Sequence, residues 1–312
     1  MMIVCGILVG IAFIVIGLTY CFFRIAFYVP DKKKRNVYDI PDSRLYKNHR
    51  DKLLKQIDEM EKIPHKKVRI TSDDGVGLCG RMYNVRDNAP VLIAFHGYRG
   101  NYAWDGYGFF KVCHEMGINI IMIDERAHGE SGGNVITFGI KERYDCVKWI
   151  QYVIRTYGES INIILAGVSM GASTILMATE LGLPANVKGI ISDCAYSRPG
   201  DIIRQTIRNM GLPLKIVYPL VKMGAHIFGH FNIEDASPVE SVEKLGIPTL
   251  FIHGSEDSVV PLAMGDILYE KCSAKKRRII IDRADHANSA LVDYDIYSQT
   301  VKEFIIRDVK DY

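Results

Sequence analysis

The sequence predicts an α/β protein with a mostly parallel, eight-stranded sheet and a helical cap, preceded by an N-terminal transmembrane helix. Three observations support this prediction. From residue 68 onward, short apolar runs alternate with longer helical patterns, which is typical of a parallel sheet covered by helices on both faces. About 55 residues separate the sixth expected strand from the seventh, far more than a crossover needs. The first 23 residues contain no charged side chain.

Length and composition limit the classes of protein to which the chain can belong. It has 312 residues, of which 48% are hydrophobic and 24% charged, so it can bury a full core and is too apolar to be disordered. The net charge of +3 is too small to suggest a nucleic-acid partner. The seven Cys are widely spaced and form no C-x-x-C pair, which favours a reducing compartment over a disulfide framework.

The apolar stretch from Met1 to Phe23 is expected to cross a membrane. As a helix, its 23 residues span about 34 Å, enough for the hydrocarbon core of a bilayer. A cleaved signal peptide is the alternative, but the stretch lacks the basic start and the small-x-small cleavage site of such a peptide. We therefore expect an uncleaved, single-pass anchor over residues 1–30.

The charges around the apolar stretch predict its orientation. Arg24 and the run Lys32-Lys33-Lys34-Arg35 follow the stretch, and no Lys or Arg precedes it. Positive residues stay on the cytoplasmic side of a membrane, so the C-terminal domain is expected to be cytoplasmic.

Residues 31–64 are expected to form a basic juxtamembrane linker and helix. Residues 31–69 hold 13 Lys and Arg against 7 Asp and Glu, an excess that anionic lipid headgroups would attract. Apolar residues recur at helical spacing between Pro41 and Pro64, which predicts an amphipathic helix over residues 43–62. Its apolar face could pack on the protein's own domain or on lipid, and the sequence leaves both open.

Residues 65–312 are expected to form one domain. Its first two strands flank a turn at Gly75 as an antiparallel pair, and the later strands run parallel. The strands are expected at residues 68–71, 78–83, 91–95, 118–123, 161–166, 189–192, 249–252 and 278–281. The helices are expected at residues 102–115, 141–157, 170–181, 264–271 and 290–307.

The long segment after the sixth strand is expected to form a cap, at about residues 195–235. Helical patterns over residues 202–210 and 214–228 are separated by a Gly-Leu-Pro break. A cap here would cover the carboxyl edge of the sheet, where α/β sheets bind ligands. Its bulky apolar residues could be core or could line an acyl-binding cleft: Leu212, Leu214, Ile216, Tyr218, Leu220, Phe228 and Phe231.

Ser169 is the candidate nucleophile. It lies in Gly167-Val168-Ser169-Met170-Gly171, directly after an expected strand and at the start of an expected helix. This is the G-x-S-x-G nucleophile elbow in the context that it requires, since the turn is so tight that larger residues would clash at both Gly positions. The free N–H groups of the helix start favour negative charge beside the serine.

A serine nucleophile needs a base, and the base needs an orienting carboxylate. His286 is the candidate base because it follows the last expected strand, on a loop at the same edge of the sheet. Asp257 follows the seventh strand and is the candidate acid, with its neighbour Glu256 in reserve. The chain order Ser169, Asp257, His286 is the order that nucleophile-elbow enzymes use.

An oxyanion formed at the serine needs two backbone donors. One candidate is the N–H of Met170, the residue after the nucleophile. The other is the N–H of Tyr98, in the loop His96-Gly97-Tyr98 that follows the third strand. A phosphate-binding loop is the rival interpretation, but the sequence around Gly97 contains neither G-x-G-x-x-G nor a Walker Lys-Ser/Thr pair.

Over residues 65–308 the sequence resembles the α/β-hydrolase-fold serine hydrolases. The segment from Asp124 to Gly132 is similar to the D-x-R-G-H-G-x-S-x-G turn of that family, with Ala127 where many members have Gly. The other matching motifs are His96-Gly97, the Ser169 elbow, Ser237-Pro238, the loop 253–261 and His286. Within the family, the sequence most resembles single-span, membrane-anchored members that are esterase-, lipase- or peptidase-like.

The resemblance implies hydrolysis of esters or acyl groups. The sequence itself predicts no cofactor and no metal: His226 and His230 have the i, i+4 spacing of metal ligands, but no Glu or Cys accompanies them. The leading hypothesis is a membrane-tethered serine hydrolase that cleaves carboxylic esters of hydrophobic acyl groups through an acyl-enzyme. A serine peptidase of the same fold and a catalytically silent scaffold are the alternatives. The sequence identifies neither the acyl group nor the leaving group.

Overall fold

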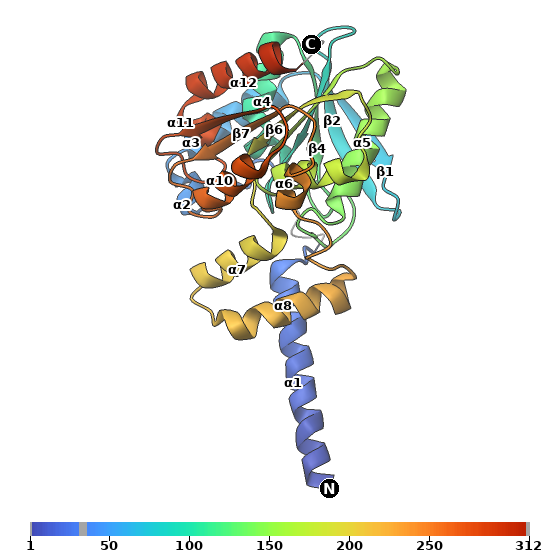
Figure 1. Ribbon diagram of the computed structural model, residues 1–312, viewed down its shortest axis with the longest axis vertical. Helices are drawn as coiled ribbons and strands as arrows, with labels where there is room; N and C mark the ends of the chain where they lie inside the picture. The colour runs from blue at the N-terminus through green and yellow to red at the C-terminus, as the bar shows by residue number, and fades with distance from the viewer. Residues whose placement is uncertain (1, 31–35, 310–312) are drawn as a thin grey trace.

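A computed structural model describes residues 2–30 and 36–309, and shows a domain from which one long helix, α1 (Met2–Ala26), projects (Figure 1). Among the described residues, α1 is the one helix long and apolar enough to cross a membrane. The basic run at residues 32–35, on which the expected orientation depends, lies outside the described residues.

The domain is built on an eight-stranded sheet with strand order β1-β2-β4-β3-β5-β6-β7-β8. The first two strands pair antiparallel, β2 pairs antiparallel with β4, and all other neighbours are parallel, as expected. The strands are β1 (Lys66–Thr71), β2 (Gly77–Tyr83), β3 (Val91–Phe95), β4 (Asn119–Asp124), β5 (Ile163–Val168), β6 (Val187–Asp193), β7 (Thr249–Gly254) and β8 (Lys276–Ile281). The central strands are buried along their whole length, because helices cover both of their faces.

Helices cover the two faces of the sheet in two groups, each packed on its own hydrophobic core. One face carries α3 (Arg50–Glu61), α4 (Tyr102–Met116), α11 (Ser289–Val292) and α12 (Tyr294–Asp308). The other carries α5 (Glu142–Tyr157), α6 (Met170–Ala178), α9 (Pro238–Val242) and α10 (Leu262–Lys271). Because neighbouring strands from β4 to β8 in the sheet order run parallel, their carboxyl ends meet at one edge of the sheet. Helix α1 projects from this edge (Figure 1).

Three expected helices differ from those observed. The helix expected over residues 43–62 is two helices, α2 (Arg44–Lys47) and α3, because the chain leaves helical geometry at His49. The one expected over residues 290–307 is divided into α11 and α12, because the Asp293 side chain accepts a hydrogen bond from the N–H of Ile296 and starts a new helix. The helix that begins at Met170 ends at Ala178 and continues as a short 3₁₀ turn.

The apolar face of α3 packs on the protein's own domain, one of the two alternatives that the sequence left open. Leu53, Ile57 and Met60 are fully buried, in the same core as α4 and α12. The Tyr107 hydroxyl also donates a hydrogen bond to Glu59, at 2.8 Å. Helix α3 is thus part of the packed domain, although in the sequence it lies between α1 and β1.

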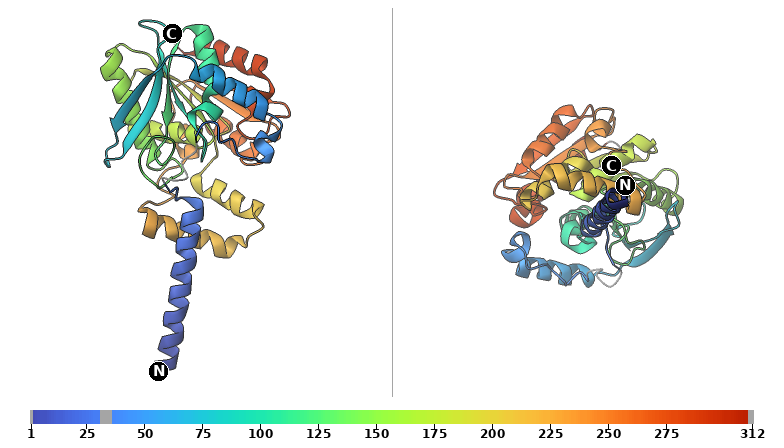
Figure 2. Two further views of the ribbon diagram at one scale, coloured as in Figure 1. Left: turned by 180° about the vertical axis from the view of Figure 1, so that it is seen from behind. Right: turned by 90° about the horizontal axis from the view of Figure 1, so that it is seen from below.

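The segment after β6 forms a helical cap at the carboxyl edge of the sheet. It contains α7 (Pro199–Asn209) and α8 (Leu214–Gly229), and α8 lies across α1 (Figures 1 and 2). The helices can approach closely because Gly224 has no side chain: a Cβ there would lie 2.9 Å from the carbonyl oxygen of Thr19. Phe228 packs against Tyr20 and Phe23 of α1, with ring centroids 5.1 and 5.8 Å apart.

Candidate active site

Ser169 lies on a sharp turn between β5 and α6, in a backbone conformation that non-glycine residues rarely adopt, with φ +55° and ψ −113°. The two flanking glycines make this turn possible. A Cβ at Gly171 would lie 2.3 Å from the carbonyl oxygen of Phe95, and a Cβ at Gly167 would lie 2.5 Å from the backbone of Gly171 and Ala172. The sequence order strand–serine–helix therefore folds into the elbow that the motif predicts.

His286 reaches Ser169 from the loop after β8. Its Nε2 lies 2.9 Å from the Ser169 Oγ, and its Nδ1 lies 2.8 Å from Oδ2 of Asp257. An ionised carboxylate can only accept hydrogen bonds, so the Nδ1 proton is donated to Asp257 and Nε2 is left to accept the hydroxyl proton of Ser169. This is the arrangement in which an imidazole can act as a base toward the serine.

Asp257 is held by its own loop after β7. Its Oδ1 accepts hydrogen bonds from the N–H groups of Val259 and Val260, at 2.9 and 2.7 Å, and its side chain is fully buried. Glu256, the reserve candidate for the acid, is exposed and makes no contact with His286. The structure thus brings Asp257, and not Glu256, to the imidazole.

The electrostatics of the pair favour an ionised Asp257 beside the imidazole. Burial raises the pKa of Asp257, but His286 and His253 outweigh it and hold the pKa of this carboxyl well below its ordinary value of 3.8. Burial lowers the pKa of His286, but the charge and hydrogen bond of Asp257 outweigh it, so that this pKa is raised above 6.5. The two shifts have the same origin, the attraction between an imidazolium and a carboxylate in a buried site.

The two expected oxyanion donors lie on either side of the serine. Met170 is the first residue of α6, so its N–H has no partner within the helix. The loop that carries Tyr98 passes beside the nucleophile: a Cβ at Gly97 would lie 3.3 Å from the Cβ of Ser169. The structure therefore brings both backbone segments to the serine.

Sequence reasoning missed Asp105, which fixes the Tyr98 loop. Its Oδ2 accepts a hydrogen bond from the N–H of Gly97 at 2.7 Å, and Gly100 lies so close that a Cβ there would be 2.4 Å from the same oxygen. Burial raises the pKa of Asp105. The sequence gives no signal for this role, because an acid in the first turn of a helix is ordinary.

His253 supports the loop that carries Asp257. Its Nε2 lies 2.9 Å from the carbonyl oxygen of Val260 and 3.3 Å from Oδ2 of Asp257. It therefore holds the loop from which Asp257 projects.

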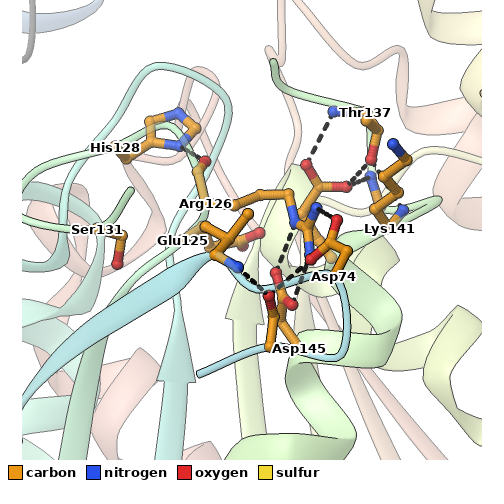
Figure 3. A network of polar contacts seen from close by, with 12 residues as sticks. Asp74, Glu125, Arg126, His128, Ser131, Thr137, Lys141 and Asp145 are labelled. Atoms are coloured by element: carbon orange, nitrogen blue, oxygen red, sulfur yellow. Dashed lines mark hydrogen bonds and ion pairs between the residues drawn. The ribbon is translucent and has the colours of Figure 1, made fainter. Parts of the chain in front are cut away.

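The turn after β4 contacts the Tyr98 loop and also takes part in a buried polar network, which Figure 3 shows. The N–H of Arg99 donates to Nε2 of His128 at 2.9 Å. Arg126 forms a two-point contact with Asp145, both distances 2.7 Å, and a further ion pair with Asp74 at 2.8 Å. Ala127, where many hydrolases have Gly, has φ +62°. The neighbouring bonds keep it in that strained geometry.

An apolar cavity of about 470 Å³ opens beside Ser169 and His286. Helix α1 forms part of its wall, through Phe22, Ile25 and Ala26. The cap supplies most of the remaining apolar wall: Ile202, Ile203, Ile207, Met210, Leu212, Val217 and Val221.

Two bulky cap residues that the sequence suggested for an acyl cleft lie elsewhere. Phe228 packs on α1, and the ring of Phe231 packs edge-on against Phe27, 5.2 Å away. Of the seven candidates, Leu212 lines the cavity. The others could not be placed from sequence, because helical periodicity does not say which neighbour an apolar face meets.

Cys194, Asp257 and His286 also offer donor atoms within 4.8 Å of one another, a spacing that could hold a metal ion. The chemistry of this set does not favour a metal. Burial raises the pKa of the Cys194 thiol well above its usual value, whereas a metal is bound by thiolate. The facing atoms of Asp257 and His286 are already hydrogen-bonded to each other.

The chain is similar to several known proteins. It is 26% identical to the protein YqkD of Bacillus subtilis over 237 residues, which cover 76% of this chain and 77% of YqkD. It is 27% identical to human ABHD12B over 63% of this chain and 53% of that protein. The crystal structure of the Pyrococcus furiosus esterase Pf2001 superposes with a TM-score of 0.65 at 22% identity, over 80% of this chain and 95% of the esterase.

The chain has the α/β-hydrolase fold. No protein-family model matches the sequence, so the fold is recognised from the structural likeness and from these distant relatives. In this hydrolase-fold protein, the elbow, the acid loop and the histidine loop follow β5, β7 and β8, in the order that the sequence resemblance implied.

The pairing of Asp257 with His286 predicts a change that can be measured without any substrate. Asp257→Asn should lower the pKa of His286, because the neutral amide no longer stabilises the imidazolium. Titration of the imidazole by NMR measures this pKa. Glu256→Gln is the matched control, and a larger effect from it than from Asp257→Asn would contradict the geometry.

Proposed function

We propose that the protein is a membrane-anchored serine hydrolase that cleaves carboxylic esters of hydrophobic acyl groups. The observation that carries the proposal is the hydrogen-bonded series Ser169–His286–Asp257, which faces an apolar cavity. The esterase Pf2001, with the same fold, supports the choice of ester hydrolysis.

The proposed chemistry follows from the positions of the three side chains. Ser169 Oγ forms a bond with the ester carbonyl carbon while its proton passes to Nε2 of His286. The oxyanion is stabilised by the N–H groups of Tyr98 and Met170. When the C–O bond breaks, His286 returns the proton to the leaving alkoxide. Water then attacks the acyl-enzyme with His286 again as the base, which releases the acid and restores Ser169.

The apolar cavity is the reason for proposing that the preferred substrate carries a hydrophobic acyl group. Most of the wall is apolar and includes aliphatic side chains from α7 and α8, which attract a hydrocarbon chain. Its charged members besides His286 are Arg99 and Asp105, and Asp105 already accepts the hydrogen bond of the Gly97 N–H. Each buried CH₂ contributes about 0.8 kcal/mol. A peptidase would instead need polar groups that recognise a peptide backbone or terminus.

The membrane assignment rests on α1. Its side chains from Met2 to Leu18 are exposed although nearly all are apolar, and such a helix is stable in lipid. Arg24 follows the apolar part and is flanked by Tyr20 and Tyr28, residues that favour a membrane interface. We place the domain on the cytoplasmic side, from the positive charge that follows the helix.

The role of Ser169 can be tested with a fluorophosphonate probe. The probe should label Ser169 covalently, and Ser169→Ala should remove the label and reduce turnover by about 10⁶-fold, as loss of a triad nucleophile does. Mass spectrometry of the labelled peptide identifies the site. Labelling that persists in the Ala variant would rule out Ser169 as the nucleophile.

The pH dependence of kcat/KM should report on His286. Below its pKa the imidazole is protonated and cannot accept the Ser169 proton, so activity should fall as pH falls, with a midpoint above 6.5 because this pKa is raised. Asp257→Asn should lower turnover by about 10⁴-fold and move the acid limb to lower pH. If the acid limb of the Asp257→Asn variant were unchanged, the group that titrates would not be His286 paired with Asp257.

The acyl preference can be measured with a series of esters from acetyl to dodecanoyl. In the wild type, kcat/KM should rise by about fourfold per CH₂ until the cavity is full. Val221→Thr adds a hydroxyl to the cavity wall at constant volume and should reduce this slope. Val301→Thr makes the same change on the buried face of α12, away from the cavity, and should leave the slope unchanged. A flat series together with faster cleavage of aminoacyl arylamides would favour a peptidase.

A further inference from the structure

Helix α8 crosses α1 close to the end of the apolar part of α1. The crossing lies at Thr19 to Phe23, one turn before the apolar part of α1 gives way to Arg24. Beyond the crossing, α1 continues away from the sheet (Figure 1). If the apolar part of α1 lies in hydrocarbon, α8 lies where hydrocarbon meets the headgroups.

The outer face of the cap is the second observation. Three large apolar side chains on it are exposed: Met210 by 57%, Ile216 by 63% and Ile227 by 46%. Exposed Pro219 lies between the latter two on α8. α8 contains Lys215 and Lys222 and no Asp or Glu, and Lys222 forms an ion pair with Glu234 beyond the helix. Exposed apolar residues beside lysines are typical of a helix that lies in the plane of a membrane surface.

The walls of the cavity are the third observation. Ser169 lies at one end of a space whose other walls include Ile25 of α1, and Met210 and Leu212 of the turn between α7 and α8. Met210 is both a wall of the cavity and an exposed residue. Ile25 of α1 also lines the cavity and is exposed, so the cavity reaches the surface beside α1 and the turn that follows α7.

We propose that the outer face of α8 and of the turn that precedes it lies in the headgroup–acyl boundary of the bilayer that α1 enters, and that a membrane-resident, long-chain ester passes from this bilayer, beside α1 and this turn, to Ser169. Continuity with α1 identifies the occupant of this face as lipid. The substrate route rests on the proposed ester hydrolysis, whereas the position of the cap does not.

The position of the cap can be tested without catalysis. The full chain is reconstituted in vesicles of phosphatidylcholine with or without bromine on the acyl chains, which quenches tryptophan at short range. Ile216→Trp should be quenched by the brominated lipid. Ile306→Trp is the matched control, because Ile306 on α12 is also 63% exposed, and it should not be quenched. The native Trp104 and Trp149 are buried and give a constant background.

The substrate route can be tested with two substrates. Ile216→Glu should lower kcat/KM by roughly tenfold for a long-chain ester embedded in the vesicles, because a charge opposes insertion of α8. It should leave hydrolysis of a water-soluble acetyl ester unchanged, since Ile216 does not line the cavity. Ile306→Glu should change neither rate, and Ile216→Leu should behave as the wild type.

The two experiments test the position of the cap and the proposed ester hydrolysis separately. Quenching at residue 216 without any ester hydrolysis would support the position of the cap and contradict the proposed function. Hydrolysis of both esters without quenching at residue 216 would support the function and overturn the position of the cap. Cross-linking of residue 216 to a second copy, with no quenching, would also overturn it. Equal rate losses on both substrates in Ile216→Glu would overturn the route.

Discussion

The close approach of α6 to the end of β3 is the constraint on which the site depends. Gly171 lies against the carbonyl of Phe95, and any side chain there would push the helix away from the strand. Only with this contact can Ser169 stand on its strained turn with Oγ toward His286. A backbone held at positive φ costs free energy, which the packed sheet on both sides of the turn offsets. The parallel register of β3 and β5 sets the distance, since Phe95 pairs with Gly167.

Charge compensation is the second requirement of the site. A buried carboxylate is costly alone, and Asp257 is stabilised by two backbone N–H groups and by the neighbouring imidazoles. Asp105 and Asp193 lie near enough to His286 to raise its pKa further. Burial raises the pKa of Asp193 itself to about 6, so its charge is weakened as the pH falls toward that value. The imidazole thus lies in a field that favours its protonated form, which a base needs once it has accepted the serine proton.

Much of the fold could be predicted from the sequence because parallel strands leave strong signals. Their cores are continuous apolar runs, and the G-x-S-x-G motif identifies one strand end by its chemistry. The side chains at the ends of β5, β7 and β8 then meet, because parallel strands share an edge. Asp257 could be preferred to Glu256 because alternate residues of an extended segment point in opposite directions.

The features that could not be predicted depend on how side chains meet in the folded chain. Asp105 follows Gly97 by only eight residues, yet an acid in the first turn of a helix gives no signal that its side chain returns to the Tyr98 loop. The break at His49 depends on how α3 fits the core, which outweighs the continuous helical pattern. Phe228 could be a core residue or a cavity residue by its sequence, and its contact with α1 decides for the former.

The Tyr98 loop, which lies beside Ser169, is hydrogen-bonded to the end of α1. The last carbonyls of a helix lack partners within it, and here two of them accept hydrogen bonds from the loop. Tyr98 Oη donates to Ala26 and the Arg99 guanidinium to Ile25, each at 2.8 Å. Tyr98 also supplies the N–H that we propose for the oxyanion. A shift of α1 would therefore move both a wall of the cavity and the N–H proposed as an oxyanion donor. The helix that we propose as the membrane anchor is thus a structural part of the proposed active site, and its position helps to set the geometry at Ser169.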